Sequence, residues 1–239
     1  MPPLRREDVL FQWFEKVNGP VWGDVLDAGT GEHSLGWVGT LGARSVTAVT
    51  VEAWRMSGLR DLVPGANVVL GEWTDPTLLY GAAFDQVLVD YVIGAIDGHA
   101  PYFQYEFLER IRPHVRDRLY LVGLEPQPRD GSLLDEVCRL RDAAILLAGH
   151  RCYRESPRSL VLRWLERAGY TVVDSKEFPN RIGARFINGQ LDVAVRKTRL
   201  FKDPVLADAM RRNIEALRER ALAQGDVTWG ADYVIAAHT

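Results

Sequence analysis

Hydrophobic and polar positions along this chain of 239 residues follow two different periodicities in turn. Short runs with continuous apolar centres are typical of buried parallel strands, and apolar residues spaced three or four apart are typical of helices. The predicted strands are 23–27, 45–51, 67–70, 84–90, 118–124, 170–175 and 231–237. The predicted helices are 6–18, 33–42, 53–62, 76–82, 102–113, 132–149, 157–168, 186–199 and 203–223.

This order of elements predicts an α/β fold. Alternation of strands and helices at this spacing is typical of a doubly wound, mostly parallel sheet, here of seven strands. We expect the last strand, 231–237, to run antiparallel beside 170–175. Residues 191–196 also fit a strand, an alternative to the helix that their wider pattern favours. The prediction is a single domain, 1–239, with residues 182–226 as a helical insertion before the last strand.

The most informative segment is the loop after the first strand, which consists of Asp27, Ala28, Gly29, Thr30 and Gly31. The first glycine lets the chain turn sharply, and the second lets a ligand approach the backbone. The helix that follows offers free N–H groups at its start. The pattern predicts a binding loop for a nucleoside-type ligand, and the alternative is a purely structural turn between strand and helix.

Charge distinguishes two candidate ligands for this loop. Dinucleotide-binding loops follow the pattern GxGxxG, whereas Ser34 occupies the third glycine position here. Glu32 places a negative charge where a pyrophosphate would lie. S-adenosylmethionine (SAM) carries an ammonium, a sulfonium and a carboxylate but no phosphate, and Asp27 suits its ammonium group. The loop therefore favours SAM over NAD(P), and an NAD(P)-dependent oxidoreductase is the weaker alternative.

Residues 25–31 (VLDAGTG) resemble motif I of the class I SAM-dependent methyltransferases. The resemblance continues through the strand and helix order of residues 24–175, and residues 232–236 resemble the last strand of many family members. It implies a Rossmann-like fold, SAM as cofactor and transfer of its methyl group to the O, N or S atom of a small-molecule acceptor. Two alternatives stay open: another SAM-family transferase, such as an aminopropyl transferase, and a non-catalytic nucleoside-binding regulatory protein.

The same resemblance implies further cofactor-binding residues. An acidic residue at the end of the second strand binds the ribose hydroxyls in the family, and here that position holds Thr50, with Glu52 two residues later. Glu72 and Trp73 follow the third strand, where the family contacts adenine. Asp90 ends the fourth strand, which the resemblance places beside the methyl group. A surface Glu52 and a core Trp73 are the structural alternatives.

Candidate acceptor-site residues lie in the segments that follow the fourth and later strands. His99 and His33 are candidate general bases because the pKa of histidine lies near neutrality, and Tyr91 is the third catalytic candidate. For the histidines the alternatives are solvent exposure and helix capping. The candidate substrate-binding residues are Tyr91, Asp97, Tyr102, Tyr105, Glu125, Arg181 and Arg185. The carboxylates among them suit a cationic acceptor, and the two arginines suit an anionic one.

Composition narrows the classes of partner. Hydrophobic residues make up 47% of the chain and charged residues 26%, with a formal net charge of -3, so nucleic acid is not an expected partner. Cys138 and Cys152 stand in no zinc-binding spacing, and no metal site is predicted. The sequence has no signal-peptide pattern and no apolar run long enough to span a membrane. We therefore expect a cytoplasmic protein, and a homodimer stays open.

Overall fold

The computed structural model describes residues 8–239, so residues 6 and 7 of the first predicted helix lie outside the described part. Seven strands form one sheet in the order β3-β2-β1-β4-β5-β7-β6. They are β1 (Asp24–Asp27), β2 (Ser45–Thr50), β3 (Asn67–Leu70), β4 (Phe84–Asp90), β5 (Val115–Leu124), β6 (Thr171–Ile182) and β7 (Val227–His238). The helices are α1 (Val9–Asn18), α2 (Glu32–Val38), α3 (Met56–Leu62), α4 (Val92–His99), α5 (Gln104–Ile111), α6 (Leu133–Leu147), α7 (Arg158–Arg167), α8 (Ala184–Thr198) and α9 (Pro204–Ala223), with short 3-10 turns at Ala53–Arg55 and Arg112–His114.

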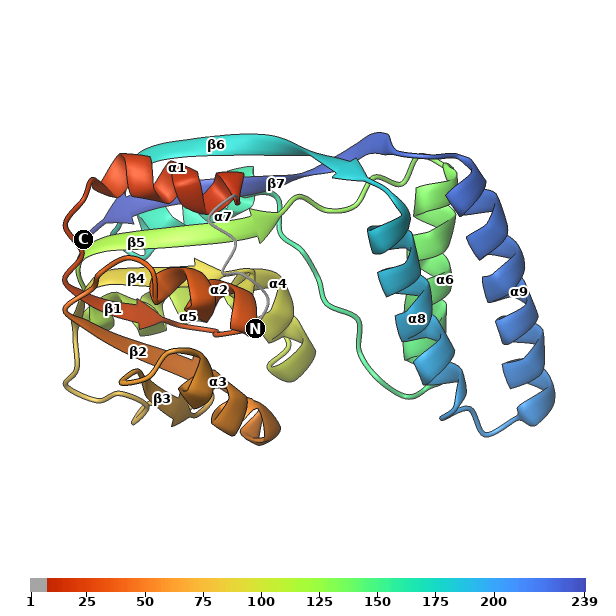
Figure 1. Cartoon of the computed structure of the whole chain (residues 1–239), viewed down its shortest axis with the longest axis horizontal. Helices are drawn as coiled ribbons and strands as arrows, with labels where there is room; N and C mark the ends of the chain where they lie inside the picture. The colour runs from red at the N-terminus through yellow and green to blue at the C-terminus, as the bar shows by residue number, and fades with distance from the viewer. Residues whose placement is uncertain (1–7) are drawn as a thin grey trace. The chain divides into compact units, whose positions relative to one another are not determined.

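The sheet confirms the predicted fold class. The pairs β3–β2, β2–β1, β1–β4 and β4–β5 are parallel, and β7 runs antiparallel to β5. Its other neighbour is β6, as expected, and the two arrows point in opposite directions in Figure 1. The chain proceeds outward from β1 through β2 to β3 and then returns to β4 on the other side of β1. The order of the strands therefore reverses between β1 and β4, where open α/β sheets bind their ligands.

The chain divides into two compact units. The first comprises the described residues up to Leu124 together with Glu155–Phe178 and Asp232–Thr239, and the second comprises Glu125–Arg154 and Pro179–Ala231. Residues 182–226, the predicted insertion, lie within the second unit. The single-domain organisation over residues 1–239 stays a prediction.

The first unit is a three-layer arrangement because neighbouring strand residues point to opposite faces of the sheet. On one face, Val25 and Leu88 belong to a core cluster that includes side chains of α1 and α2. On the other, Leu26 and Val87 belong to a cluster that includes side chains of α4, α5 and α7. The sheet is thus buried on both faces, which explains its continuous apolar strands.

In the second unit, α6, α8 and α9 pack together in one helical cluster (Figure 1). Their apolar sides meet around buried residues such as Val137, Leu191 and Ile214. The helical prediction for 186–199 is confirmed, and the strand alternative for 191–196 is wrong. The expected helical pair thus has a third helix, α6, as its partner.

Two local predictions were wrong. The segment 76–82 forms consecutive turns instead of a helix, because the Asp75 carboxylate accepts hydrogen bonds from Thr77 and the backbone of Leu79 is left-handed with φ 55°. The segment after β4, predicted as a loop, contains α4. Its two glycines obscured the helical pattern, but Ile93 and Ile96 pack into the core and outweigh the weak local propensity.

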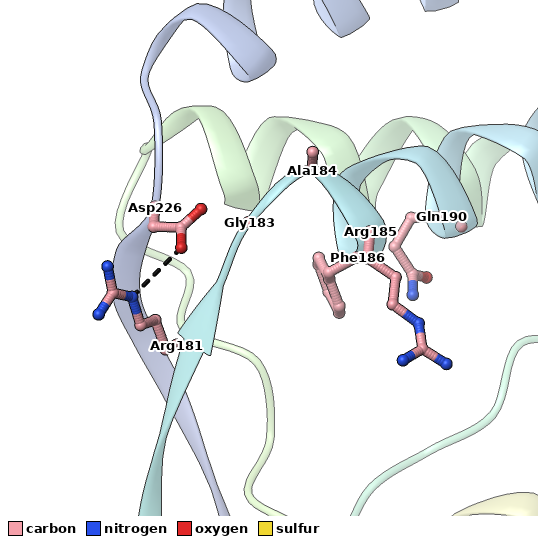
Figure 2. Close-up of a pocket in the computed structure, with 8 residues that line it drawn as sticks. Arg181, Gly183, Ala184, Arg185, Phe186, Gln190 and Asp226 are labelled. Carbon is pink, nitrogen blue, oxygen red and sulfur yellow. Dashed lines mark hydrogen bonds and ion pairs between the residues drawn. The ribbon is translucent and has the colours of Figure 1, made fainter. Parts of the chain in front are cut away.

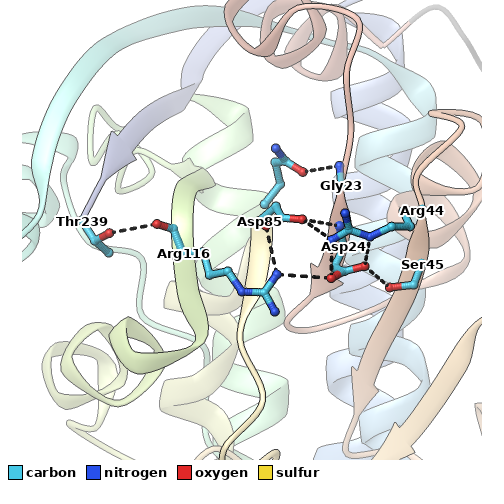
Figure 3. Close-up of polar contacts among 8 residues, drawn as sticks. Gly23, Asp24, Arg44, Ser45, Asp85, Arg116 and Thr239 are labelled. Carbon is cyan, nitrogen blue, oxygen red and sulfur yellow. Dashed lines mark hydrogen bonds and ion pairs between the residues drawn. The ribbon is translucent and has the colours of Figure 1, made fainter.

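The amino ends of β1, β4 and β5 are joined by a network of charges, shown in Figure 3. The Arg44 Nη2 atom lies 2.6 Å from Asp24 Oδ2 and 2.8 Å from Asp85 Oδ2, and Arg116 contacts the same two carboxylates at 3.2 Å and 3.0 Å. Hydrogen bonding from Arg44 is the largest cause that lowers the pKa of Asp24. In this network each carboxylate meets two guanidinium groups.

Within residues 8–239, no helix combines the length and the apolar composition needed to cross a membrane.

Candidate functional site

The loop after β1 is built around a buried carboxylate. Asp27 is fully shielded from solvent, and its Oδ2 atom accepts a hydrogen bond of 2.6 Å from the Thr30 hydroxyl. Its other oxygen, Oδ1, is buried and has no hydrogen-bond partner among the described residues. Burial raises the pKa of Asp27 to about 6, although Thr30, the Ser34 side chain and the backbone of Gly29, all near the carboxylate, oppose this shift. An acceptor atom is thus held ready inside the loop.

The two glycines of the loop have different tasks. A Cβ atom on Gly29 would stand 2.3 Å from Cγ2 of Val92, so a side chain there would collide with the start of α4. A Cβ atom on Gly31 would meet nothing within 4 Å. Gly29 therefore permits close packing of the loop on α4, whereas Gly31 faces open space that a ligand can enter.

The backbone of the loop is fixed from three sides. Ala28 N–H donates to Leu88 O and Thr30 N–H to Val49 O, each at 2.8 Å, and these bonds tie the loop to β4 and β2. Gly31 N–H donates to the Ser34 hydroxyl at 3.1 Å, which ties the loop to α2. The carboxyl ends of β4 and β2 and the start of α2 thereby set the shape of the loop.

Trp73 supports this loop from within the core. Its indole Nε1–H donates to Ala28 O at 2.6 Å, and its ring packs edge-on against Phe107 and His114. Only 5% of the residue is exposed, so the ring has no free face for an adenine. This placement agrees with the structural alternative, a core Trp, and a contact of Trp73 with the border of an adenine stays a prediction. Glu72, predicted with it, is exposed.

The end of β2 carries the residues predicted to bind a ribose. Thr50 is buried, and its hydroxyl accepts a hydrogen bond of 3.2 Å from the N–H of Glu52. The Glu52 carboxylate is paired with Arg55, whose guanidinium also lies over the exposed ring of Trp54 at 4.7 Å. The ion pair uses the Oε2 atom of Glu52, and a carboxylate can accept further hydrogen bonds, for example from a diol. The ribose roles of Thr50 and Glu52 stay predictions.

The end of β4 brings further carboxylates to the same place. Burial, followed by the nearby charges of Asp27, Asp8 and Asp232, raises the pKa of Asp90 to about 8. Tyr91 follows in a left-handed conformation with φ 53°, uncommon for an aromatic residue, and caps the start of α4. Burial and the neighbouring carboxylate of Asp232, which also hydrogen-bonds with the phenol, raise the pKa of Tyr91.

His33 is engaged in a pair with the start of α1. Its Nε2 atom lies 2.8 Å from Asp8 Oδ2, and its ring stacks on Phe11 with centroids 5.2 Å apart. Asp8 also caps α1 through the N–H of Leu10. His33 therefore fastens α1 to the loop region, a structural task that competes with the predicted role as a base.

His99, the other candidate base, is the last residue of α4 and is exposed. On the same helix Asp97 is buried, and its Oδ1 atom accepts a hydrogen bond from the N–H of Tyr102 at 3.2 Å. Tyr102 has a φ of 69° and is 73% exposed. Asp97 therefore shapes the turn after α4, and the predicted roles of these residues toward an acceptor stay predictions.

Tyr105, in α5, is committed to contacts with its neighbours. Its hydroxyl donates to Glu109 at 2.5 Å, and the guanidinium of Arg167 lies 4.7 Å from its ring centroid. Its ring also packs against Trp164 of α7. These contacts agree with the alternative interpretation, in which Tyr105 packs between two helices.

Glu125, Arg181 and Arg185 belong to the second unit. Glu125 directly follows β5, and its N–H donates to Ala231 O at 2.9 Å. Arg181 is paired with Asp226 at 3.2 Å, and Arg185 lies at the start of α8 (Figure 2). Both arginines line a shallow pocket together with Phe186. The structure brings the two arginines to one pocket, and acceptor binding there stays a prediction.

Sequence reasoning missed two of the aspartates whose charges act on Asp90, namely Asp8 and Asp232. Asp8 precedes the first helix in a position typical of an N-cap. The sequence could therefore have predicted that Asp8 caps this helix, but not that it lies near Asp90. Asp232 lies in β7, in register with Leu124 at the end of β5. Its position beside Tyr91 depends on the antiparallel return of the last strand. Among the described residues, no group of three His, Cys, Asp or Glu side chains is arranged to hold a metal ion.

No family model matches the sequence, and no curated protein sequence matches it. Several solved structures are similar. A provisionally assigned methyltransferase of Bacillus halodurans is 14% identical with a TM-score of 0.63, over 96% of this chain and 98% of its own. The cyclopropane-fatty-acyl-phospholipid synthase-like protein of Lactobacillus casei is 12% identical with a TM-score of 0.63, over 96% and 89%.

A third similar structure contains a ligand. The 1,6-didemethyltoxoflavin-N1-methyltransferase of Burkholderia thailandensis, solved with 1,6-didemethyltoxoflavin and S-adenosylhomocysteine bound, is 18% identical with a TM-score of 0.55, over 96% of this chain and 76% of its own. At these identities the likeness establishes the fold. The chain has the fold of class I SAM-dependent methyltransferases.

Proposed function

We propose that this protein is a SAM-dependent methyltransferase that acts on a small-molecule acceptor. The observation that carries the proposal is Asp27, a fully buried carboxylate with a partnerless oxygen, in a glycine loop at the point where the strand order reverses. The fold of the similar structures agrees with it. A cytoplasmic location belongs to the same proposal.

The charge of the site supports SAM over a dinucleotide. Asp27 and Asp90 lie close enough for the charge of one to raise the pKa of the other. A pyrophosphate beside them would add negative charge to negative charge. The ammonium and sulfonium groups of SAM would compensate these carboxylates, and the open space at Gly31 admits a ligand to the backbone.

SAM, when bound, supplies an electrophilic methyl group on its sulfonium. The task of this chain is then to align the acceptor with that group and to exclude water. The carboxylate of Asp27 would fix the ammonium end, and the carboxylate of Glu52 would accept hydrogen bonds from the ribose diol. Tyr91, at the N-cap position of α4 next to Asp90, would contact the acceptor.

A base is needed only for an acceptor that loses a proton. His99 is the better of the two histidine candidates because its side chain is exposed, whereas His33 is paired with Asp8. The similar structures include an N1-methyltransferase and a cyclopropane-fatty-acyl-phospholipid synthase-like protein. The acceptor screen should therefore include nitrogen and carbon nucleophiles as well as oxygen and sulfur.

Calorimetric titration of the purified chain with SAM, S-adenosylhomocysteine (SAH) and NAD tests the proposal. We expect binding of SAM and SAH in the micromolar range and no binding of NAD. An aminopropyl transferase would instead prefer decarboxylated SAM. Tight binding of NAD, or binding of none of these ligands, would overturn the proposal. Methyl transfer to a screened acceptor would then separate an enzyme from a regulatory protein that only binds the ligand.

A further inference from the structure

Five large aliphatic side chains are exposed at one end of the helical cluster in the second unit. Their exposed fractions range from 40% for Leu206 to 75% for Val205. Together they form the apolar tip, which consists of Leu146, Leu147, Leu200, Val205 and Leu206. Single exposed leucines are common on protein surfaces, whereas a group of them marks a contact with another molecule.

Side-chain contacts bring the segments of the apolar tip to the same end of the cluster. Lys197 Nζ, in the last turn of α8, lies 2.8 Å from Nδ1 of His150, which follows α6. Arg211 Nε, in the first half of α9, donates to the Thr198 hydroxyl at the end of α8 at 3.0 Å. The carboxyl ends of α6 and α8 therefore lie beside the amino end of α9, as Figure 1 also shows.

The core of the cluster is formed by other side chains. Val137, Leu191 and Ile214 are buried in it, and Phe201, the neighbour of Leu200 in the turn between α8 and α9, packs against it. The apolar tip faces water instead, so its side chains forgo the free energy that burial of apolar surface would provide. A contact that covers the tip would recover this free energy.

Cationic side chains accompany the apolar tip. They are Arg151, Arg196, Lys197, Arg199 and Lys202. Within residues 8–239, none of these five side chains forms an ion pair with a carboxylate. Two of them suit the negative end of the α8 dipole, but Arg199 and Lys202 lie beyond the last residue of that helix. Asp203, the one acidic residue within 196–206, is engaged as the N-cap of α9. The tip is thus edged by positive charge that the chain does not compensate.

We propose that the apolar tip docks the protein on a membrane surface that carries anionic lipids. The aliphatic side chains would enter the boundary between lipid headgroups and acyl chains, and the neighbouring cations would contact the lipid phosphates. Lys and Arg suit this position because their apolar stems can lie along the acyl chains while their charges reach the headgroups. Such docking needs no membrane-spanning helix, and it does not depend on the proposed function.

Charge favours an anionic membrane over a second copy of this chain as the partner. Two apolar tips that met face to face would also bring two sets of cations together, and their repulsion opposes association. The tip consists of Leu and Val, whereas protein interfaces are enriched in aromatic residues. An anionic lipid surface would compensate the cations and cover the aliphatic side chains at the same time.

The test is co-sedimentation of the full chain with vesicles of equimolar phosphatidylcholine and phosphatidylglycerol, and with vesicles of phosphatidylcholine alone. We expect binding to the mixed vesicles that weakens in high salt, and little binding to the neutral vesicles. Combining Leu147→Gln, Leu200→Gln and Val205→Gln should weaken this binding by about tenfold or more. Combining Arg199→Gln and Lys202→Gln should weaken it about fivefold for each charge removed.

Matched controls carry the same kinds of substitution away from the apolar tip. Leu222→Gln changes an exposed leucine at the opposite end of α9. Arg60→Gln combined with Arg163→Gln removes two exposed charges from α3 and α7 of the first unit. The control variants should bind the mixed vesicles as the unmodified chain does, within about twofold.

Hydrogen exchange of the unmodified chain keeps the proposal testable if a tip variant does not fold. The mixed vesicles should slow exchange of the backbone in residues 199–206 and leave residues 222–226 unchanged. Absence of binding to the mixed vesicles, or equal weakening by the tip and control variants, would overturn the proposal. Self-association that the tip variants abolish, without binding to vesicles, would assign the surface to a second copy and would also overturn it. Each of these outcomes leaves the binding of SAM, and hence the proposed function, to its own test.

Discussion

The two ends of β1 each carry an aspartate, and the two carboxylates meet opposite surroundings. At the amino end, Asp24 lies between Arg44 and Arg116, and hydrogen bonding to Arg44 lowers its pKa (Figure 3). At the carboxyl end, Asp27 is buried among other carboxylates, and its pKa is raised to about 6. At the amino end of β1 the carboxylate is therefore paired with arginines, and at the carboxyl end it lies near other carboxylates.

This difference separates stability from function within a single sheet. Paired surface charges change the stability of the fold little, by about 0–1 kcal/mol per pair, and here they join three strand ends. Buried carboxylates without cations destabilise the fold, and such perturbed groups concentrate at functional sites. The carboxyl end of β1 also lies where the strand order reverses, which is the expected ligand position. The following substitutions test the comparison, from the largest expected effect to the smallest.

Asp27→Asn should weaken SAM binding by about 100-fold, the equivalent of roughly 2.7 kcal/mol, because it removes the carboxylate held ready in the loop. Folding should not suffer, since the neutral amide avoids the burial of a charge. Calorimetry and thermal unfolding measure the two effects. An unchanged affinity for SAM would contradict the functional role given to the carboxylate at the carboxyl end of β1.

Trp73→Ala should lower the free energy of unfolding by about 3–5 kcal/mol, because it removes a large core side chain beneath the loop. Trp73→Phe should cost less and isolates the hydrogen bond to Ala28 O. Urea denaturation followed by circular dichroism gives both values. A fully stable Trp73→Ala protein would show that the ring is not part of the core.

Gly29→Ala and Gly31→Ala form a matched pair. The first should destabilise the fold by about 1–3 kcal/mol, because the new methyl group collides with Val92. The second should leave the unfolding midpoint unchanged and weaken ligand binding, since its methyl group points into open space. Equal unfolding midpoints for both variants would contradict the different tasks given to the two glycines.

The free energy of unfolding should depend on pH through Asp90 and Asp27, the carboxylates at the carboxyl ends of β4 and β1. Asp90 has a pKa of about 8 in the folded chain against 3.8 ordinarily, so the folded state binds more protons than the unfolded state between these values. The free energy of unfolding should therefore fall as the pH rises from about 4 to about 8, with Asp27 adding to the fall up to about pH 6. Asp90→Asn should flatten the upper part of this curve in denaturation series.

Arg44→Ala should have the smallest effect. It removes one of two guanidinium groups from an exposed network, so the midpoint of thermal unfolding should fall slightly. The difference from the unmodified chain should shrink in high salt, which screens surface charges. Ligand affinity should not change. A large loss of affinity would mean that the two ends of β1 are coupled.

Much of the architecture was predictable because it depends on local patterns. Continuous apolar runs predicted the seven strands of the sheet, helical spacing predicted nine helices of which eight are present, and the DAGTG loop indicated the candidate site. The exceptions have physical causes. The turns at 76–82 arise from Asp75 and positive backbone angles, and α4 owes its stability to core packing that outweighs its glycines.

The sequence by itself determined the fold class and the position of the loop with Asp27, because hydrophobic periodicity and glycine spacing are local properties. Only the tertiary structure decided that Trp73 supports that loop from the core, that His33 is paired with Asp8, and that Asp232 joins Asp90. These relations join residues far apart in the chain. The charge state of a carboxylate depends on burial and on its neighbours in space, which no local pattern records.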